Sequence, residues 1–170
     1  MPLAQQGVHV CQATCDSARP LNCGVRPRMP SYAASLAIGA PREAVWRVLA
    51  AVVAWPKWLP TVSTVEALDG EPLQIGFRYT VRQPKLRPAT WVVRELGPPR
   101  CFVWEARSPG LLMIASHTIE ESLPGKSLVT LRFSFTGLLG APIGWLFRST
   151  TKRYLAQELA SLRSVVERQQ

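Results

Sequence analysis

The C-terminal stretch of residues 141–168 restricts more than any other how this 170-residue chain can fold. Apolar residues recur there in steps of three and four, which places them in one stripe along an amphipathic helix. The stripe consists of Leu155, Leu159, Leu162 and Val166. At ~1.5 Å per residue such a helix is about 40 Å long, so it can cross a whole sheet. We therefore expect one long helix that closes the fold.

Five segments between residues 77 and 135 alternate apolar with polar side chains, which is typical of strands that bury one face. Turns that contain Pro or Gly separate these segments. Further strands are predicted at residues 31–38 and 61–68, and a helix at 41–54, with Pro41 at its first position. Pro56 and Pro60 prevent this helix from continuing. A long helix packed on a curved antiparallel sheet leaves room between the two. The pattern therefore predicts an α+β fold with an internal cavity.

The composition is that of a globular domain, because 47% of the residues are hydrophobic and 18% are charged. The longest uncharged apolar stretch, residues 133–147, is shorter than the ~18 residues that a membrane-spanning helix needs. Gly140 and Pro142 also interrupt it. Residues 1–10 lack a basic start and a continuous apolar segment, so no secretory signal is visible. We expect a cytoplasmic protein with no integral membrane segment.

The net charge is +9, and basic residues gather between residues 78 and 107. Such a surface can attract nucleic acid, anionic lipid or an acidic partner protein. Arg78, Arg82 and Arg94 project from outward strand positions, but no nucleic-acid motif accompanies them. We therefore expect a solvated strand face and no nucleic-acid partner. A protein-interaction module that uses this face remains an alternative, and the oligomeric state is left open.

Residues 1–30 show neither a helical nor a strand period, and we predict a flexible extension before one ligand-binding domain at residues 31–168. His9, Cys11, Cys15 and Cys23 lie in this extension and are residue types that bind metals. Their spacing matches no zinc motif, so we expect no metal. No glycine-rich phosphate loop is present, and we expect no cofactor.

His117 is the candidate catalytic residue. Strand parity places it on the face of Ala115 and Ile119, so its side chain should point inward. A neutral imidazole there could bind a ligand or transfer a proton near neutral pH. Alternatively, it is a structural histidine bonded to the backbone or to a nearby Tyr or Ser. Glu95 and Glu158 are expected to reach solvent, which disfavours an enzyme built on paired carboxylates.

A family resemblance rests on residues 38–46, 55–60 and 117–120, supported by Gln83-Pro84 and Trp91. These segments resemble the polyketide cyclase/dehydrase branch of the SRPBCC (START-like, helix-grip) superfamily. The resemblance covers residues 31–167 and implies a curved antiparallel sheet wrapped around a long C-terminal helix, with a cavity between them. Members include aromatase/cyclases, lipid-transfer domains and quinone-binding proteins. An acidic residue that often precedes the Trp-Pro segment is replaced here by Ala54 or its apolar neighbours.

We predict that the cavity binds a hydrophobic or aromatic small molecule, as in a carrier or sensor. The rival hypothesis is a cyclase/dehydratase-like enzyme that uses His117 as general acid or base. Trp91 and Trp104 either stack on a planar ligand or fill the core. The predicted ligand-binding residues are Phe77, Tyr79, Gln83, Trp91, Phe102, Trp104, His117, Phe133 and Tyr154.

Overall fold

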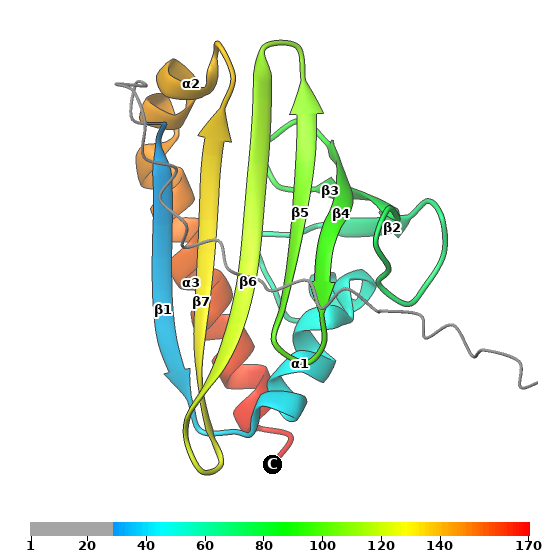
Figure 1. Ribbon diagram of the computed structural model, residues 1–170, viewed down its shortest axis with the longest axis vertical. Coiled ribbons are helices and arrows are strands. Elements are labelled where there is room, and N and C mark those ends of the chain that lie inside the picture. The colour runs from blue at the N-terminus through cyan, green and yellow to red at the C-terminus, as the bar shows by residue number, and fades with distance from the viewer. Residues whose placement is uncertain (1–28) are drawn as a thin grey trace, which may run out of the picture.

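The computed structural model of the chain describes residues 29–170. They form one antiparallel sheet with a long helix against one face (Figure 1). The strands are β1 (Ser31–Ile38), β2 (Thr64–Ala67), β3 (Arg78–Arg82), β4 (Ala89–Gly97), β5 (Cys101–Ser108), β6 (Leu111–Leu123) and β7 (Lys126–Thr136). The helices are α1 (Arg42–Ala50), a 3₁₀ helix η1 (Val52–Lys57), α2 (Gly140–Leu146) and α3 (Arg148–Glu167).

The seven strands follow the order β1-β7-β6-β5-β4-β3-β2, and every neighbouring pair is antiparallel. The chain therefore runs from β2 to β7 as a meander, and β1 pairs with β7 at the far edge. Helix α3 lies against β1 and β7, while α1 packs on β6, β7 and α3. The predicted α+β fold with an antiparallel sheet and a long C-terminal helix is confirmed.

Strand parity directs one set of side chains into the interior, as the alternation predicts. Trp104 of β5 is paired with Ala115 of β6, and His117 follows two residues later on the same face. A bulge at Arg94 shifts the register between β4 and β5, and such bulges bend a strand and increase its twist. Gly125 has a φ of +73° in the turn after Pro124, which glycine adopts without a steric penalty.

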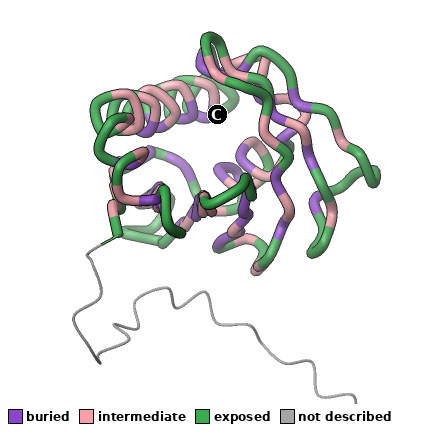
Figure 2. Tube along the Cα trace, turned by 90° about the horizontal axis from the view of Figure 1, so that it is seen from above, coloured by how far each residue is buried: buried purple, intermediate pink, exposed green. Residues whose placement is uncertain are grey.

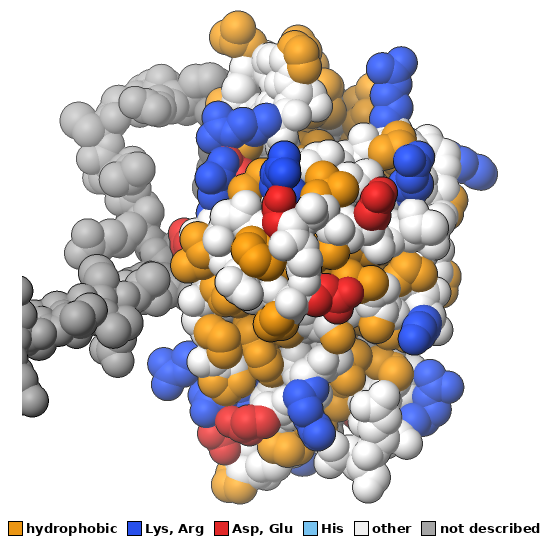
Figure 3. All heavy atoms as spheres, turned by 90° about the vertical axis from the view of Figure 1, so that its right-hand side faces the viewer, with side chains coloured by type: hydrophobic (Ala, Val, Ile, Leu, Met, Phe, Trp, Pro, Cys, Tyr) orange, Lys and Arg blue, Asp and Glu red, His pale blue; other side chains and the backbone are white. Residues whose placement is uncertain are grey.

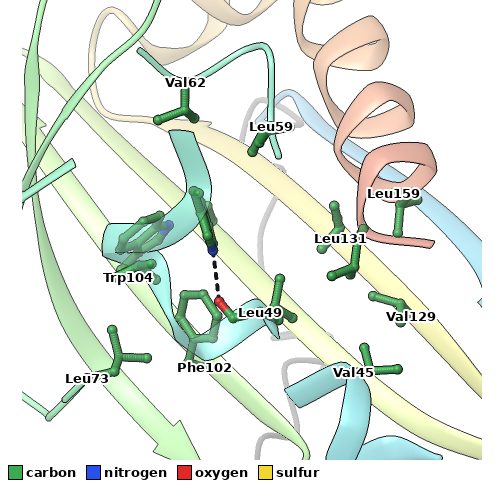
Figure 4. Close-up of a cluster of buried hydrophobic side chains, with 14 of the residues drawn as sticks. Val45, Leu49, Leu59, Val62, Leu73, Phe102, Trp104, Val129, Leu131 and Leu159 are labelled. Atoms are coloured by element: carbon green, nitrogen blue, oxygen red, sulfur yellow. Dashed lines mark hydrogen bonds between the residues drawn. The ribbon is translucent and has the colours of Figure 1, made fainter. Parts of the chain in front are cut away.

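One end of the sheet is covered by α1 and η1. The Trp55 indole N–H donates to the Leu49 carbonyl oxygen at 2.9 Å, which ties the two helices together (Figure 4). The Phe102 ring packs against Trp46 of α1 and Trp55 of η1, with ring centroids 6.3 and 6.5 Å apart. This end of the sheet is therefore closed by packed aromatic side chains.

The predicted single helix over residues 141–168 is wrong, because the structure divides it at Phe147 into α2 and α3. Gly144 of α2 packs so closely that a Cβ there would lie 2.6 Å from Pro30 Cβ. The Tyr32 hydroxyl also donates to the Gly144 carbonyl oxygen at 2.9 Å. These contacts fix α2 beside the start of β1, and α3 then takes its own direction. The apolar stripe of α3 is buried as predicted, facing the interior (Figure 2).

Two predicted boundaries also differ. Helix α1 ends at Ala50 instead of residue 54, and the chain continues as η1, which contains Pro56. The strand predicted at 61–68 is limited to β2. No helix within residues 29–170 is long and apolar enough to cross a membrane. Residues 1–28 of the predicted extension lie outside the described residues, and these include His9, Cys11, Cys15 and Cys23.

Candidate ligand-binding site

A cavity of about 490 Å³ lies between α3 and the inner face of the sheet. Its wall includes strands β4 to β7, the loop at residues 83–88 and the first half of α3. Most of the wall is apolar, with aromatic rings from Trp55, Trp91, Trp104 and Phe133. Small-molecule sites in proteins have volumes of roughly 300–1,000 Å³ and mainly apolar walls. The cavity is therefore large enough for a ligand with several rings.

His117 lies in the cavity wall with a side chain that is 5% exposed. Its imidazole stacks on the Phe102 ring, with centroids 4.1 Å apart and planes 10° from parallel. His117 Nε2 is 3.3 Å from Glu158 Oε1, and the Glu158 side chain is 14% exposed. The separation is that of an ion pair, but the contact falls short of hydrogen-bond geometry. The histidine is thus fixed by stacking and lies beside a carboxylate.

Glu158 faces the cavity wall instead of solvent, so the expectation from the sequence is wrong for this residue. Tyr154 and Glu158 are four residues apart on α3 and therefore share one row of the helix. That row lies beside the buried stripe and borders the cavity. Tyr154 was already a candidate, so the spacing of four residues between Tyr154 and Glu158 could have predicted that Glu158 also borders the cavity.

Three buried polar atoms of the wall have no hydrogen-bond partner within residues 29–170. They are Trp104 Nε1, His117 Nδ1 and Glu158 Oε1. Trp55, also in the wall, differs because its indole N–H is bonded to Leu49. The rings of Trp104 and His117 lie with centroids 5.9 Å apart. The unpartnered atoms therefore belong to neighbouring side chains of one region of the wall.

The structure brings six of the nine predicted ligand-binding residues into the wall. These are Gln83, Trp91, Trp104, His117, Phe133 and Tyr154. Phe77, Tyr79 and Phe102 lie outside it, which corrects their expected position. Tyr79 is completely buried, and its hydroxyl donates to the Gly70 carbonyl oxygen at 3.4 Å. Phe102 is completely buried behind His117, and Phe77 is half-buried against the core.

Burial raises the pKa of Tyr79, and the nearby charges of Glu71 and Asp69 act in the same direction. Its hydroxyl therefore stays neutral at physiological pH. Because Tyr79 also lies outside the wall, it is not placed to act on a ligand in the cavity. Tyr154 is the tyrosine that borders the cavity.

Three basic residues of the segment between residues 78 and 107 contact acidic side chains. Arg78 makes a two-pronged contact with Asp69, with Nη2 to Oδ1 at 2.8 Å and Nε to Oδ2 at 2.9 Å. Arg94 and Arg107 both contact Glu105 Oε1, at 2.7 and 3.0 Å. One side of the molecule shows basic side chains scattered among acidic and apolar ones (Figure 3). Three of the seven basic residues between 78 and 107 therefore lie in ion pairs, and two of these share one carboxylate.

Residues 29–167 match the family described as polyketide cyclase / dehydrase and lipid transport. The chain belongs to this family. The match spans nearly all of the described residues, and the family resemblance drawn from the sequence is confirmed. Family membership supports binding of a hydrophobic ligand or a cyclase role, which are the two hypotheses from the sequence.

Several solved structures are similar in fold to this member of the polyketide cyclase/dehydrase family. An aromatase/cyclase from Streptomyces sp. R1128 is 18% identical, with a TM-score of 0.68 over 82% of this chain and 94% of that one. A START superfamily protein from Mycobacterium smegmatis is 14% identical, with a TM-score of 0.65 over 82% and 99%. At these identities the neighbours show the helix-grip fold alone. No curated protein matches the chain significantly.

Proposed function

We propose that this protein binds a hydrophobic or aromatic small molecule in the cavity between α3 and the sheet, as a carrier or sensor. The observation that carries the proposal is the cavity of about 490 Å³ with a mainly apolar, aromatic wall. A chain that only needed to fold would fill this space with side chains, because protein interiors are close-packed. The family, whose description includes lipid transport, supports the same function.

The basic residues in the loop between β3 and β4 favour a ligand that carries negative charge at one end. Lys85 and Arg87 border the cavity and are exposed, so they mark its open side. A basic entrance raises the local concentration of anionic molecules. A ligand with an apolar body and an anionic tail would therefore enter with the body toward the tryptophans.

Binding of 1-anilinonaphthalene-8-sulfonate tests the proposal, because this probe combines aromatic rings with an anionic group. We expect saturable fluorescence enhancement that Ala115→Phe abolishes, since Ala115 lies in the wall and a phenyl ring there occupies the cavity. The matched control is Ala33→Phe on β1, an exposed position remote from the wall, which should bind like the wild type. Equal binding by wild type and Ala115→Phe would refute the proposal. Native mass spectrometry of the purified protein can then identify a bound molecule.

A second function is favoured by the contact between His117 and Glu158. His117 Nε2 and Glu158 Oε1 lie 3.3 Å apart in the cavity wall, so a histidine and a carboxylate, both residue types used in acid–base catalysis, are adjacent there. A cyclase/dehydratase-like reaction could use this arrangement. Incubation of the protein with aromatic ketones and phenols, followed by mass spectrometry, separates the two functions. A carrier returns the molecule unchanged, whereas an enzyme that uses His117 as a base loses turnover in His117→Gln but keeps binding.

A further inference from the structure

Large apolar side chains are exposed at one end of the molecule, on α2 and on the two residues before it. Of the eight large apolar residues that are exposed within residues 29–170, four fall in this segment of nine. Figure 3 shows apolar side chains that project at the upper end, where Figure 1 places α2. A group of exposed apolar side chains marks an interaction site. We call the four residues the apolar tip: Leu138, Leu139, Trp145 and Leu146.

The backbone of α2 packs tightly, so the exposure of the apolar tip does not come from a loose segment. Gly140 and Gly144 are buried on the inner side of α2. A Cβ at Gly140 would lie 3.0 Å from the backbone of β7, and one at Gly144 would lie 2.6 Å from Pro30. The Leu139 N–H donates to the Gly110 carbonyl oxygen at 2.8 Å, which ties this segment to the turn between β5 and β6. Helices usually bury their large apolar residues, whereas α2 buries its smallest ones.

The chain around the apolar tip carries positive charge and no negative charge. No acidic residue occurs between Glu121 and Glu158. Directly after α2, the first two turns of α3 contain three exposed cations, Arg148, Lys152 and Arg153. None of the three forms an ion pair within residues 29–170. The apolar tip is therefore followed by positive charge that no neighbouring carboxylate neutralises.

This combination distinguishes between the possible partners. A second copy of the chain would bring Arg148 and Lys152 of both copies together, because a two-fold interface pairs the same patch with itself. A stable interface with another protein takes about 20–30 residues a side, far more than this segment offers. An anionic bilayer fits both features. Its interface accommodates Trp and Leu, and its headgroups attract Lys and Arg.

We propose that the apolar tip and the three cations after it dock the protein on the surface of bilayers that contain anionic lipid. Trp145 lies at the level of the headgroups, and Leu138 and Leu146 reach the acyl chains. Apolar insertion and charge attraction are each weak alone, and firm docking requires both. Ile143 and Phe147 of the same segment belong to the cavity wall, so docking brings the cavity close to the lipid. Docking itself does not require a ligand in the cavity.

Co-sedimentation of the full chain with sucrose-loaded vesicles tests the proposal. One set of vesicles contains phosphatidylcholine alone, and the other contains phosphatidylcholine with about 30% phosphatidylserine. We expect the apparent dissociation constant for the anionic vesicles to be lower by roughly tenfold or more, since each cation near such a surface contributes about a factor of five. The preference should weaken as salt is added, because salt screens exposed charges.

The double variant Trp145→Ser with Leu146→Ser tests the apolar contribution. Both side chains are exposed and lie outside the cavity wall, so the fold and dye binding should be unaffected. We expect binding to anionic vesicles to weaken at least tenfold. The matched control is Ile75→Ser with Leu123→Ser, which removes two apolar side chains that are 59% and 60% exposed outside the tip. This control should bind like the wild type.

A triple variant tests the charge contribution: Arg148→Gln, Lys152→Gln and Arg153→Gln. It should lose the preference for phosphatidylserine. The matched control removes the same charge from exposed positions on α1, on the turn after β4 and on the second half of α3, and should keep the preference. Its substitutions are Arg47→Gln, Arg100→Gln and Arg163→Gln.

Tryptophan fluorescence locates the inserted side chain. Trp145 is the one exposed tryptophan of the six, all of which lie within residues 29–170. Anionic vesicles with brominated acyl chains should therefore quench the fluorescence of the wild type, and Trp145→Phe should lose most of this quenching. Near-ultraviolet circular dichroism checks that every variant folds.

The outcomes decide between the bilayer and its alternatives. Equal binding of the wild type to both kinds of vesicle, or to neither, overturns the proposal and leaves the proposed function untouched. Anionic binding that the folded Trp145→Ser, Leu146→Ser variant retains in full also overturns it, because charge alone then explains the contact. Light scattering provides the last arm. A wild-type dimer that this variant converts to a monomer, without vesicle binding, would assign the apolar tip to a second copy of the chain instead.

Discussion

Ala115→Ile offers a direct test of whether the space beside β6 is free. Ala115 faces the interior, is 8% exposed and lies between Trp104 on β5 and Phe133 on β7. Isoleucine adds three carbons at this position and is favoured in strands. Burying them contributes about 2.4 kcal/mol at ~0.8 kcal/mol per carbon. The lost rotamer freedom opposes this by ~0.5–1 kcal/mol. The net expectation is a gain of about 1.5 kcal/mol in the free energy of unfolding.

The matched control is Ala106→Ile on β5. Ala106 is also buried and inward, at 2% exposed, but it lies outside the cavity wall. Extra carbons in a packed core cost ~1–3 kcal/mol. Both substitutions replace Ala with Ile. Opposite changes in the free energy of unfolding would therefore come from the cavity alone.

Thermal melting of ligand-free protein, followed by near-ultraviolet circular dichroism, measures the difference. A gain of about 1.5 kcal/mol corresponds to a rise of roughly 5 °C in Tm for a domain of this size. Ala106→Ile should lower Tm instead. If Ala115→Ile destabilises the protein as much as Ala106→Ile does, the space beside β6 is closed and our account of the wall is wrong.

Three further predictions concern residues outside the cavity wall. Burial alone would raise the pKa of Glu105, but hydrogen bonds from Arg107 and Arg94 outweigh it and hold the pKa below 4.5. The ionised Glu105 therefore stabilises the fold above its unfolded pKa, and this contribution is lost as pH falls through its folded pKa. In Glu105→Gln the free energy of unfolding, measured with urea, should depend less on pH between pH 5 and 3 than in the wild type. The same pH dependence in both proteins contradicts this. Because Arg78 is paired with Asp69, fluorescence polarisation should detect no micromolar oligonucleotide binding at physiological salt. Tyr79→Phe should cost less than ~1 kcal/mol, since its hydroxyl bond is long at 3.4 Å, and should leave dye binding unchanged.

Sequence reasoning succeeded where one local rule decides the outcome. The direction of a strand side chain follows from parity, so Trp91, Trp104 and His117 could be placed inside from the order of residues alone. The stripe of α3 could be predicted in the same way from helical spacing. These positions depend only on neighbours along the chain.

Sequence reasoning failed where distant elements decide. Tyr79 and Phe102 share the inward parity of Trp104, yet packing from elsewhere in the chain removes them from the wall, as Trp46 and Trp55 do for Phe102. Parity states which way a side chain points but not whether another element already fills the space ahead of it. The break at Phe147 likewise depends on Gly144 meeting Pro30, a contact between opposite ends of the described chain.

Residues spaced four apart on α3 change in character where the cavity ends. Thr150, Tyr154 and Glu158 follow at steps of four and all border the cavity, while the next residue of the row, Leu162, is completely buried in the core. The row therefore changes from polar to apolar at the point where the helix leaves the cavity and meets packed side chains. Across the cavity, the sheet contributes mainly aromatic and aliphatic side chains. A bound molecule would meet Thr150, Tyr154 and Glu158 on its helix side, and aromatic rings together with the imidazole of His117 on its sheet side.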